Sequence, residues 1–280
     1  MFNRVGQWRT STRAARCCTR VAPWLFLLSL AACGGSSAPG PTSPAPIPAA
    51  DACNLIGGIA STLGLPILNG TECSADRSSV VLLNARTASG AGGACSGTVV
   101  TRRHILTAAH CLDEDVTSIL VWLGSGDQIP AQSFVYYPNY RFNTPGVYDV
   151  GVVVMGADLP RNPVPILTSR DARVGEAAVI AGWGRDQLDR PATLRAGSTS
   201  ISAVNAAFIE TPYAPPASSV CSGDSGGPIL VSEGGAWSIA GITSATSAAV
   251  CNTGTNFYQA VRHPSVRDFI LQHVPNITQR

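Results

Sequence analysis

The segment from residue 221 to residue 231 reads CSGDSGGPILV, and the interpretation of the whole chain starts from it. Its first half is rich in glycine, and its second half, Ile229-Leu230-Val231, is a short apolar run typical of a buried strand. The glycines around Ser225 let the backbone turn sharply and leave its N–H groups free. A serine hydroxyl is a weak nucleophile at neutral pH, so Ser225 needs a base within hydrogen-bond reach if it is to react.

A second segment supplies a candidate base. It reads Leu106-Thr107-Ala108-Ala109-His110-Cys111 and follows an apolar, β-prone stretch that begins at Ser96. Imidazole suits the role because its pKa lies near the working pH and it can return the proton to a leaving group. The base in turn needs a buried carboxylate that fixes its tautomer. Candidates between the two segments include Asp113, Asp115, Asp127, Asp149, Asp158 and Asp171.

Asp149 is the preferred carboxylate. It opens the run Asp149-Val150-Gly151-Val152-Val153-Val154, a short apolar strand that starts from a polar loop. The alternative is an aspartate that merely caps a turn at the start of a strand. No motif surrounds His104, His263 or His273, and we interpret these three as ordinary surface or packing histidines.

Together the two segments resemble the histidine and serine motifs of the trypsin and chymotrypsin family of serine proteases. They occur in the family's order, 115 residues apart. The likeness covers about three quarters of the chain. Further segments that resemble the family are Ile67-Leu68-Asn69-Gly70, Cys95-Ser96-Gly97-Thr98, Tyr137-Pro138-Asn139-Tyr140, Asn162-Pro163-Val164 and Ala181-Gly182-Trp183-Gly184.

The resemblance implies an all-β, chymotrypsin-like fold of two six-stranded antiparallel β-barrels, with the catalytic triad between them. Helical spacing of apolar residues from His263 to Val274 matches the family's C-terminal helix. The implied triad is His110, Asp149 and Ser225, and the implied oxyanion hole consists of the N–H groups of Gly223 and Ser225.

The resemblance also implies activation by cleavage. In the family, a cut creates an N-terminal amine that pairs with the aspartate before the catalytic serine, here Asp224. The candidate new terminus is Ile67, but Pro66 stands where the family usually has a basic residue. Three possibilities follow: another protease cuts there, the terminus lies elsewhere, or the chain is active uncut.

The sequence contains nine cysteines. Cys17 and Cys18 fall in the expected signal segment, and Cys33 lies directly after it. The six that remain are an even set, which in an exported chain predicts three disulfides. By resemblance, Cys95 pairs with Cys111 and Cys221 pairs with Cys251. Cys53 and Cys73 have no other expected partner, and their pairing would hold residues 53–66 to the body of the protein after a cut. Metal-binding spacings of the C-x-x-C or H-x-x-x-H type are absent from the sequence, so we expect neither a metal nor a cofactor.

The resemblance places a substrate pocket around four residues: Ser219 at its base, Thr246 and Asn256 in its walls, and Ser244 beside the substrate backbone. An arginine or lysine side chain would be buried unpaired above Ser219, so we expect no preference for a basic P1 residue. Small neutral P1 residues rank first, medium apolar ones second. Acidic P1 residues rank third, for a pocket lined by Ser222, Thr243 and Thr246.

The N-terminus is expected to be an export signal. Residues 1–20 are arginine-rich and precede an apolar stretch, Val21 to Ala32, which is too short to span a bilayer comfortably. The signal over residues 1–32 leads into Leu30-Ala31-Ala32-Cys33, which resembles the bacterial lipobox, so Cys33 is a candidate for lipidation. An ordinary signal cleaved near Ala32 is the alternative.

Three further segments follow the signal. Residues 33–52 are rich in Gly, Ser and Pro and predict a spacer. Residues 53–66 form a candidate propeptide, and residues 67–280 form the expected protease domain. Lysine is absent and alanine is abundant, which is typical of a high-GC bacterial genome.

Charge argues against nucleic acid as a partner. Without the signal, 14 arginines stand against 17 acidic residues, a net charge of −3, and no basic run remains. The family resemblance implies a serine endopeptidase that acts on proteins or peptides, and we expect it to be a monomer. It would be exported and held at a membrane surface of the bacterial envelope by a lipid on Cys33, or otherwise secreted. The rival functions are a catalytically silent binding module on the same fold and an esterase.

Overall fold

The computed structural model of the protein describes residues 47–57, 69–112, 115–141, 148–185, 193–248, 250–251 and 253–280. These residues all belong to one compact unit, Ser43–Arg280. The lipidation candidate Cys33 and the expected new terminus Ile67 lie outside the described residues. None of the helices in the described ranges is long and apolar enough to cross a membrane.

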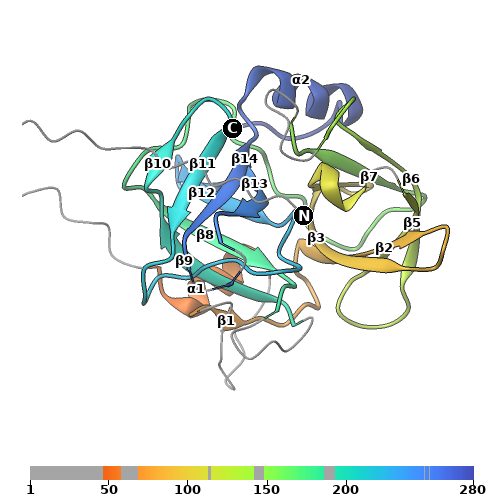
Figure 1. Cartoon of the computed structure of the whole chain (residues 1–280), viewed down its shortest axis with the longest axis horizontal. Coiled ribbons are helices and arrows are strands. Elements are labelled where there is room, and N and C mark those ends of the chain that lie inside the picture. Colours follow the sequence, from red (N-terminus) through yellow and green to blue (C-terminus); the bar gives the residue numbers. More distant parts are fainter. Residues whose placement is uncertain are drawn as a thin grey trace, which may run out of the picture. The chain divides into compact units, whose positions relative to one another are not determined.

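The first half of the described chain forms a closed barrel of six antiparallel strands in the order β2-β3-β4-β7-β6-β5. Their bounds are β2 (Val80–Thr87), β3 (Gly92–Thr101), β4 (His104–Thr107), β5 (Val116–Trp122), β6 (Ile129–Tyr136) and β7 (Gly151–Met155). Branched apolar side chains favour a pleated, half-buried surface. Accordingly Val81, Ile105 and Val153 are fully buried in the barrel core, on the right of Figure 1.

The second half forms an eight-stranded sheet in the order β1-β9-β8-β12-β13-β14-β11-β10. The bounds are β1 (Thr71–Glu72), β8 (Ala177–Gly182), β9 (Arg195–Ser200), β10 (Ala203–Val204), β11 (Phe208–Pro212), β12 (Pro228–Glu233), β13 (Ala236–Thr246) and β14 (Thr255–Ala260). Successive side chains of a strand point to opposite faces. Val179 and Leu230 therefore join the core cluster of the barrel, whereas Ile180 and Ile229 belong to a second cluster.

The predicted all-β, chymotrypsin-like fold is thus confirmed. The first half is the expected six-stranded barrel. Among the described residues of the second half, six longer strands carry a two-residue strand, β1 or β10, at each end of the sheet.

The predicted C-terminal helix is also present, as α2 (Pro264–His273). Pro264 suits the first helical turn, where its missing N–H has no intrahelical partner to lose. The buried residues Val266, Phe269 and Ile270 share one helix face. The ring of Phe269 lies 5.8 Å from that of Tyr137, so α2 packs on the segment that follows β6 (Figure 1).

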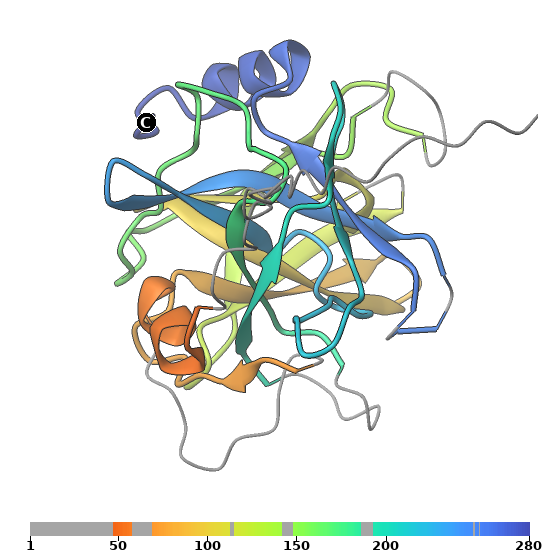
Figure 2. The ribbon, with the colours of Figure 1, turned by 90° about the vertical axis from the view of Figure 1, so that its left-hand side faces the viewer.

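A second helix, α1 (Ala49–Leu55), crosses the boundary predicted between spacer and propeptide at residue 52/53. It lies against β9 and β1 (Figure 2). Ala52 and Cys53 are fully buried, and Cys53 is bonded to Cys73 just after β1. The alanine-rich sequence after Pro48 favours a helix. The packed part of the chain therefore begins before residue 53, the predicted start of the propeptide.

Candidate active site

His110 and Asp149 meet at the edge of the barrel. His110 lies in η1 (Ala109–Cys111), a single 3₁₀ turn after β4, and Asp149 lies two residues before β7. Because β4 and β7 are paired, the two side chains are brought together. Nδ1 of His110 lies 2.8 Å from Oδ2 of Asp149, and the backbone N–H of His110 donates to Oδ1 at 3.0 Å. Two hydrogen bonds therefore fix the imidazole relative to the carboxylate.

The carboxylate of Asp149 is itself held from the second half. The hydroxyl of Ser244, on β13, donates to its Oδ2 at 2.6 Å. The backbone N–H of Asp149 donates to the side-chain oxygen of Gln259, on β14, at 3.2 Å. Both Asp149 and Gln259 are buried. A buried carboxylate with this many donors has a single preferred orientation.

This arrangement determines the tautomer of His110. An ionised carboxylate only accepts hydrogen bonds, so Nδ1 of the imidazole must be the donor. In the neutral ring, Nε2 is then the acceptor. A quarter of the His110 side chain is exposed, against 6% of the Asp149 side chain. The accepting nitrogen, Nε2, therefore belongs to His110, the more exposed of the two residues.

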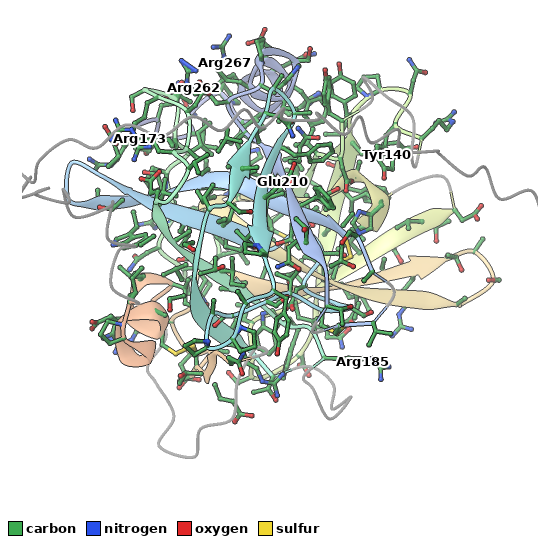
Figure 3. The ribbon with its side chains drawn as sticks, turned by 60° about the vertical axis from the view of Figure 1, so that its left-hand side comes forward. Tyr140, Arg173, Arg185, Glu210, Arg262 and Arg267 are labelled. Carbon is green, nitrogen blue, oxygen red and sulfur yellow. A yellow bond between two sulfur atoms is a disulfide. The ribbon has the colours of Figure 1, made fainter. Side chains whose placement is uncertain are left out.

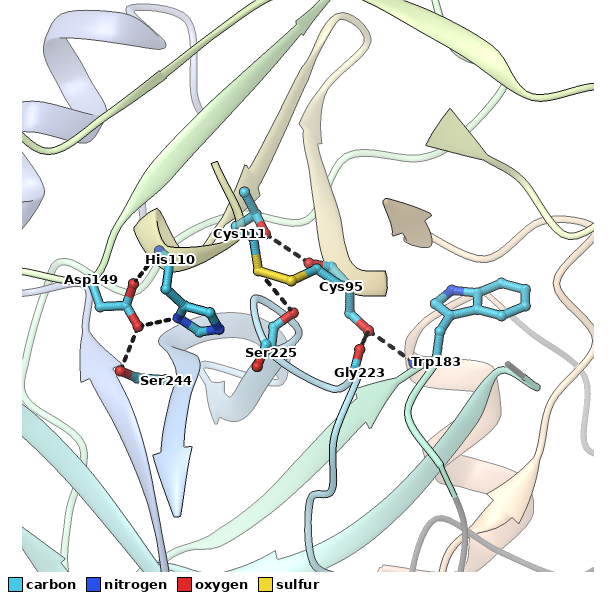
Figure 4. The surroundings of a disulfide bond; sticks show 10 residues. Cys95, His110, Cys111, Asp149, Trp183, Gly223, Ser225 and Ser244 are labelled. Carbon is cyan, nitrogen blue, oxygen red and sulfur yellow. Dashed lines mark hydrogen bonds and ion pairs between the residues drawn. A yellow bond between two sulfur atoms is a disulfide. The ribbon is translucent and has the colours of Figure 1, made fainter. Parts of the chain in front are cut away.

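Ser225 stands three residues before β12, in the glycine-rich segment 221–227. In Figure 4 it lies on the side of the His110 ring that faces away from Asp149. Its carbonyl oxygen lies 3.8 Å from the sulfur of Cys111, the residue that follows His110. The three predicted catalytic residues are thus brought to one place.

The nucleophile loop, residues 221–227, is tied to the barrel through Ser96 of β3. The N–H of Ser96 donates to the carbonyl of Ser225 at 2.7 Å, and its hydroxyl donates to the carbonyl of Gly223 at 2.9 Å. The N–H of Trp183 donates in turn to that hydroxyl at 2.9 Å. One buried serine therefore connects the barrel, the loop and the end of β8.

The backbone around Gly223 suits an oxyanion hole. Gly223 has φ +96°, a conformation that residues with a side chain rarely adopt. The carbonyl of Ser222 accepts from the N–H of Arg185 at 2.9 Å. In a trans peptide the N–H points away from the preceding carbonyl, so the N–H of Gly223 points away from Arg185.

Asp224 belongs to the nucleophile loop, and its side chain is buried. Its carboxylate accepts the N–H of Gly184 and the N–H of Cys221, each at 2.8 Å. A Cβ at Gly182 or Gly184 would lie within 2.6 Å of this carboxylate, so the two glycines of the Gly-Trp-Gly segment form its cradle. Burial raises the pKa of Asp224 to about 6, and the two N–H groups and the charge of Arg195 oppose that rise.

The structure brings the predicted base of the pocket together with one wall residue. The hydroxyl of Ser219 donates to Oδ1 of Asn256 at 3.1 Å, and Nδ2 of Asn256 donates to the hydroxyl of Thr211 at 3.1 Å. Ser219 and Asn256 are each 1% exposed. Thr246, paired with Asn256 across β13 and β14, is exposed. Of the predicted pocket residues, Ser219 and Asn256 are therefore buried and bonded to each other, whereas Thr246 is exposed.

Three disulfides occur in the described residues: Cys53–Cys73, Cys95–Cys111 and Cys221–Cys251. They are the pairings that the sequence and the family resemblance implied. Among the described residues, Cys95, His110 and Cys111 form a cluster with metal-ligand spacing. Both cysteines are bonded to each other, so they offer no thiolate to a metal.

A cavity of about 600 Å³ opens beside the first turn of α2. The arginines that border it are Arg170, Arg262 and Arg267. Their carboxylate partners are, in the same order, Glu176, Asp171 and Asp268. Figure 3 shows Arg262 and Arg267 close together near the helix. Since none of the three candidate catalytic residues borders it, this cavity is not the candidate active site.

Sequence reasoning missed the residues that support the triad. Ser96 lies inside a segment that was matched to the family, but its role became visible only with the fold. Gln259 and Arg195 carry no sequence signal, because their partners lie 110 and 123 residues away along the chain. His263, interpreted as an ordinary histidine, binds the hydroxyl of Tyr148 at 2.9 Å, beside Asp149.

Comparison with known proteins supports the same interpretation. The family model described as Trypsin matches residues 67–270. Phenoloxidase-activating factor 3 of Holotrichia diomphalia is 27% identical over 228 residues, which cover 64% of this chain and 64% of that protein. Chymotrypsin-like elastase family member 1 of Bos taurus is 26% identical over 186 residues, 56% of this chain and 70% of that protein. The solved structure of HL collagenase matches with a TM-score of 0.60 at 21% identity, covering 70% of this chain and 93% of that one, which shows likeness of fold.

Proposed function

Because the chain belongs to the trypsin family of serine proteases, we propose that it is a serine endopeptidase that cleaves peptide bonds through an acyl-enzyme on Ser225. The observation that carries the proposal is the pair of hydrogen bonds between His110 and Asp149. They leave Nε2 as the accepting nitrogen of a side chain that is a quarter exposed, which is what a general base for a serine hydroxyl requires.

The proposed reaction has two halves. The Ser225 oxygen attacks the substrate carbonyl carbon while its proton passes to Nε2 of His110. The N–H groups of Gly223 and Ser225 stabilise the oxyanion, and Asp149 stays ionised and stabilises the imidazolium. His110 then gives the proton to the leaving amine as the C–N bond breaks. Water, deprotonated by His110, cleaves the acyl-enzyme in the same way and releases the acid.

A phosphonofluoridate probe tests the nucleophile. It should label the protein at Ser225 and should not label a Ser225→Ala variant. Ser222→Ala is the matched control, since it removes a neighbouring exposed hydroxyl of the same loop and should still be labelled. Absence of labelling would favour the silent binding module. Labelling with ester turnover but without peptide cleavage would favour the esterase.

We further propose a P1 preference for small or medium uncharged residues over Arg and Lys. The support is the buried chain of hydrogen bonds from Ser219 through Asn256 to Thr211. It closes the base of the pocket with hydroxyl and amide groups, where a basic P1 side chain would need a carboxylate. A peptide-library cleavage profile tests this: dominant cleavage after Arg or Lys would contradict it, and dominant cleavage after Asp or Glu would favour the acidic alternative.

Activation and location complete the proposal. The new terminus after a cut at Pro66–Ile67 would bring its amine to Asp224 and strengthen the hold on the nucleophile loop. Three disulfides and the family relatives indicate an extracellular or secreted protein. We propose that a lipid on Cys33 anchors it and that it acts as a monomer. Labelled palmitate should be incorporated by the native chain but not by Cys33→Ser, and the mass in solution should be that of one chain.

A further inference from the structure

Arg195, the first residue of β9, is one of the largest fully buried side chains in the described part of the protein. Only 2% of its side chain is exposed. An arginine is almost never fully buried unless its charge is compensated, because removing a charge from water is costly. The groups that surround the Arg195 guanidinium should therefore include the ones that compensate its positive charge.

One partner of Arg195 is Glu72, which lies directly opposite it in the pairing of β1 with β9. Nη2 of Arg195 lies 3.3 Å from Oε1 of Glu72. A quarter of the Glu72 side chain is exposed, so water satisfies part of this carboxylate. Glu72 therefore holds the guanidinium of Arg195 at the sheet edge but neutralises its positive charge only in part.

Gly184 links Arg195 to Asp224. Nη1 of Arg195 donates to the carbonyl of Gly184 at 3.2 Å, and the N–H of the same glycine donates to Oδ1 of Asp224 at 2.8 Å. The guanidinium and the buried carboxylate thus contact one residue at its two polar groups. Both side chains are buried, so their charges are screened less by water than surface charges would be. Arg195 is one of the influences that lower the pKa of Asp224 against the effect of burial.

The segment that carries Glu72 is already in place in the uncut chain. Nδ2 of Asn69 donates to the carbonyl of Ala217 at 3.2 Å, and the hydroxyl of Ser218 donates to the carbonyl of Asn69 at 3.0 Å. The N–H of Cys73 donates to the carbonyl of Leu194 at 2.9 Å. Asn69 and Cys73 are therefore docked on the second half of the chain before any new terminus is made.

We propose that Arg195 is a positioning residue that holds Asp224, and with it the nucleophile loop, in the uncut chain, so that the chain hydrolyses substrate before any cleavage at Ile67. This inference rests on the proposed function of Ser225. The amine released by a cut would add a second positive charge at Asp224 and raise an activity that already exists. This role of Arg195 would also explain how the chain can be active although Pro66 stands where the family usually has a basic residue before the cut.

The activity test compares uncut and cut forms of one preparation. A Pro66→Arg background lets immobilised trypsin create the Ile67 terminus, and N-terminal sequencing verifies the cut. In the uncut form, Arg195→Met should lower kcat/KM at least tenfold, mainly through kcat, since a disordered oxyanion donor costs about 10²–10³ in kcat. In the cut form the loss should be below threefold. Arg195→Lys should restore most of the uncut activity, because it keeps the charge.

Arg170→Met is the matched control. It also removes an arginine with a mostly buried side chain, but its ion pairs are with Glu176 and Glu233, away from the nucleophile loop. The ratio of uncut to cut activity should stay unchanged in this variant. If Arg195→Met lowers both forms equally, as a general loss of stability would, the proposal is overturned.

A second readout does not depend on activity. In a Ser225→Ala background, carboxyl carbon NMR can follow the titration of Asp224, which is assigned by its loss in Asp224→Asn. Among the described residues, the ionisable groups that face Asp224 are Arg195 from β9 and Tyr258 from β14, with Glu72 behind Arg195. Arg195→Met should raise the pKa of Asp224 and Glu72→Gln should lower it, while Arg170→Met should leave it unchanged.

The two readouts keep the failures distinct. No probe labelling of Ser225 in either form would defeat the proposed protease function, while the NMR titration would still test the link between Arg195 and Asp224. Normal labelling with an Asp224 titration insensitive to Arg195→Met and Glu72→Gln would defeat the present inference alone. Should Arg195→Met not fold, Glu72→Gln still tests the link: it should lower the pKa of Asp224, and an unchanged titration would defeat the inference.

Discussion

At the scale of single residues, the carboxylate of Asp149 is held by donors from both halves of the described chain. It accepts from the backbone and the ring of His110 and from the hydroxyl of Ser244. A carboxamide in its place would present an NH₂ group to one of these donors and favour the wrong imidazole tautomer. Replacing the carboxylate of Asp149 by a carboxamide of the same shape therefore tests its hydrogen bonding without changing its packing.

Asp149→Asn should lower kcat by about 10⁴ with little change in the folded structure, because the amide is isosteric but fixes the wrong tautomer of His110. The measurement is kcat on the peptide found in the library profile, with thermal unfolding as the check on folding. Asp158→Asn, which removes an exposed carboxylate paired with Arg103, should retain full kcat. A similar loss in both variants would contradict a catalytic role for Asp149.

Asn256→Gly should widen the accepted P1 residues toward larger apolar side chains. Removing the amide opens space beside Ser219 and frees its hydroxyl, which now donates to Oδ1 of Asn256. The library profile of the variant should gain cleavage after Leu, Met or Phe. Thr246→Gly, at an exposed position, should change the profile less. An unchanged profile in Asn256→Gly would place the specificity pocket elsewhere.

The residues that could be predicted from sequence are those whose neighbours along the chain form the motif. His110 and Ser225 have such neighbours, and Asp149 is identified by the strand that it opens. Ser96, Gln259 and Arg195 act on these residues from other strands. No local pattern marks them, and their roles depend on which strands pair.

At the scale of elements, α2 is tied to the site through its first residues. Nδ1 of His263 accepts the N–H of Ser265 at 3.2 Å and so caps the helix, which leaves Nε2–H to donate to the hydroxyl of Tyr148. Burial lowers the pKa of His263 below its ordinary value of 6.5. Only the neutral ring can accept at Nδ1, so the cap and the pKa direction agree.

This histidine makes the stability of the protein depend on pH. Because the folded pKa is lowered, its contribution is fully present above pH 6.5 and is lost as pH falls through the folded pKa. His263→Ala should cost about 1 kcal/mol at pH 8 for the lost cap, and less at pH 5. His263→Asn keeps a cap acceptor that does not titrate. Denaturant unfolding at both pH values measures the difference, and equal losses at both would contradict the assignment.

The extent of elements was harder to predict than their kind. The apolar spacing after Pro264 was sufficient for α2 because the helix is amphipathic and capped at its start. The residues of α1 are mostly small and follow a proline-rich stretch, so composition placed part of them in a spacer. Burial against β9 and the bond to Cys73 decide their structure, and neither is visible in a composition.

At the scale of the whole molecule, the Cys53–Cys73 disulfide spans the expected cut. After cleavage at Pro66–Ile67, the N-terminal piece should stay attached through this bond and separate only on a reducing gel. Activity should then remain in the membrane fraction if Cys33 is lipidated. In a Cys53→Ser, Cys73→Ser variant, cleavage should release the active domain into solution. Release from the native chain without reductant would contradict this prediction.

The two remaining disulfides have a different consequence, because each ends beside the catalytic machinery. Cys111 follows His110 directly, and Cys221 opens the nucleophile loop. Such bonds do not persist in the reducing cytoplasm. A newly made chain in the cytoplasm would therefore lack both disulfides. Comparing the activity of the protein made in reducing and in oxidising hosts would show how far activity depends on them. If the chain is an exported protease, as proposed, oxidation on export would complete its active site only outside the cytoplasm.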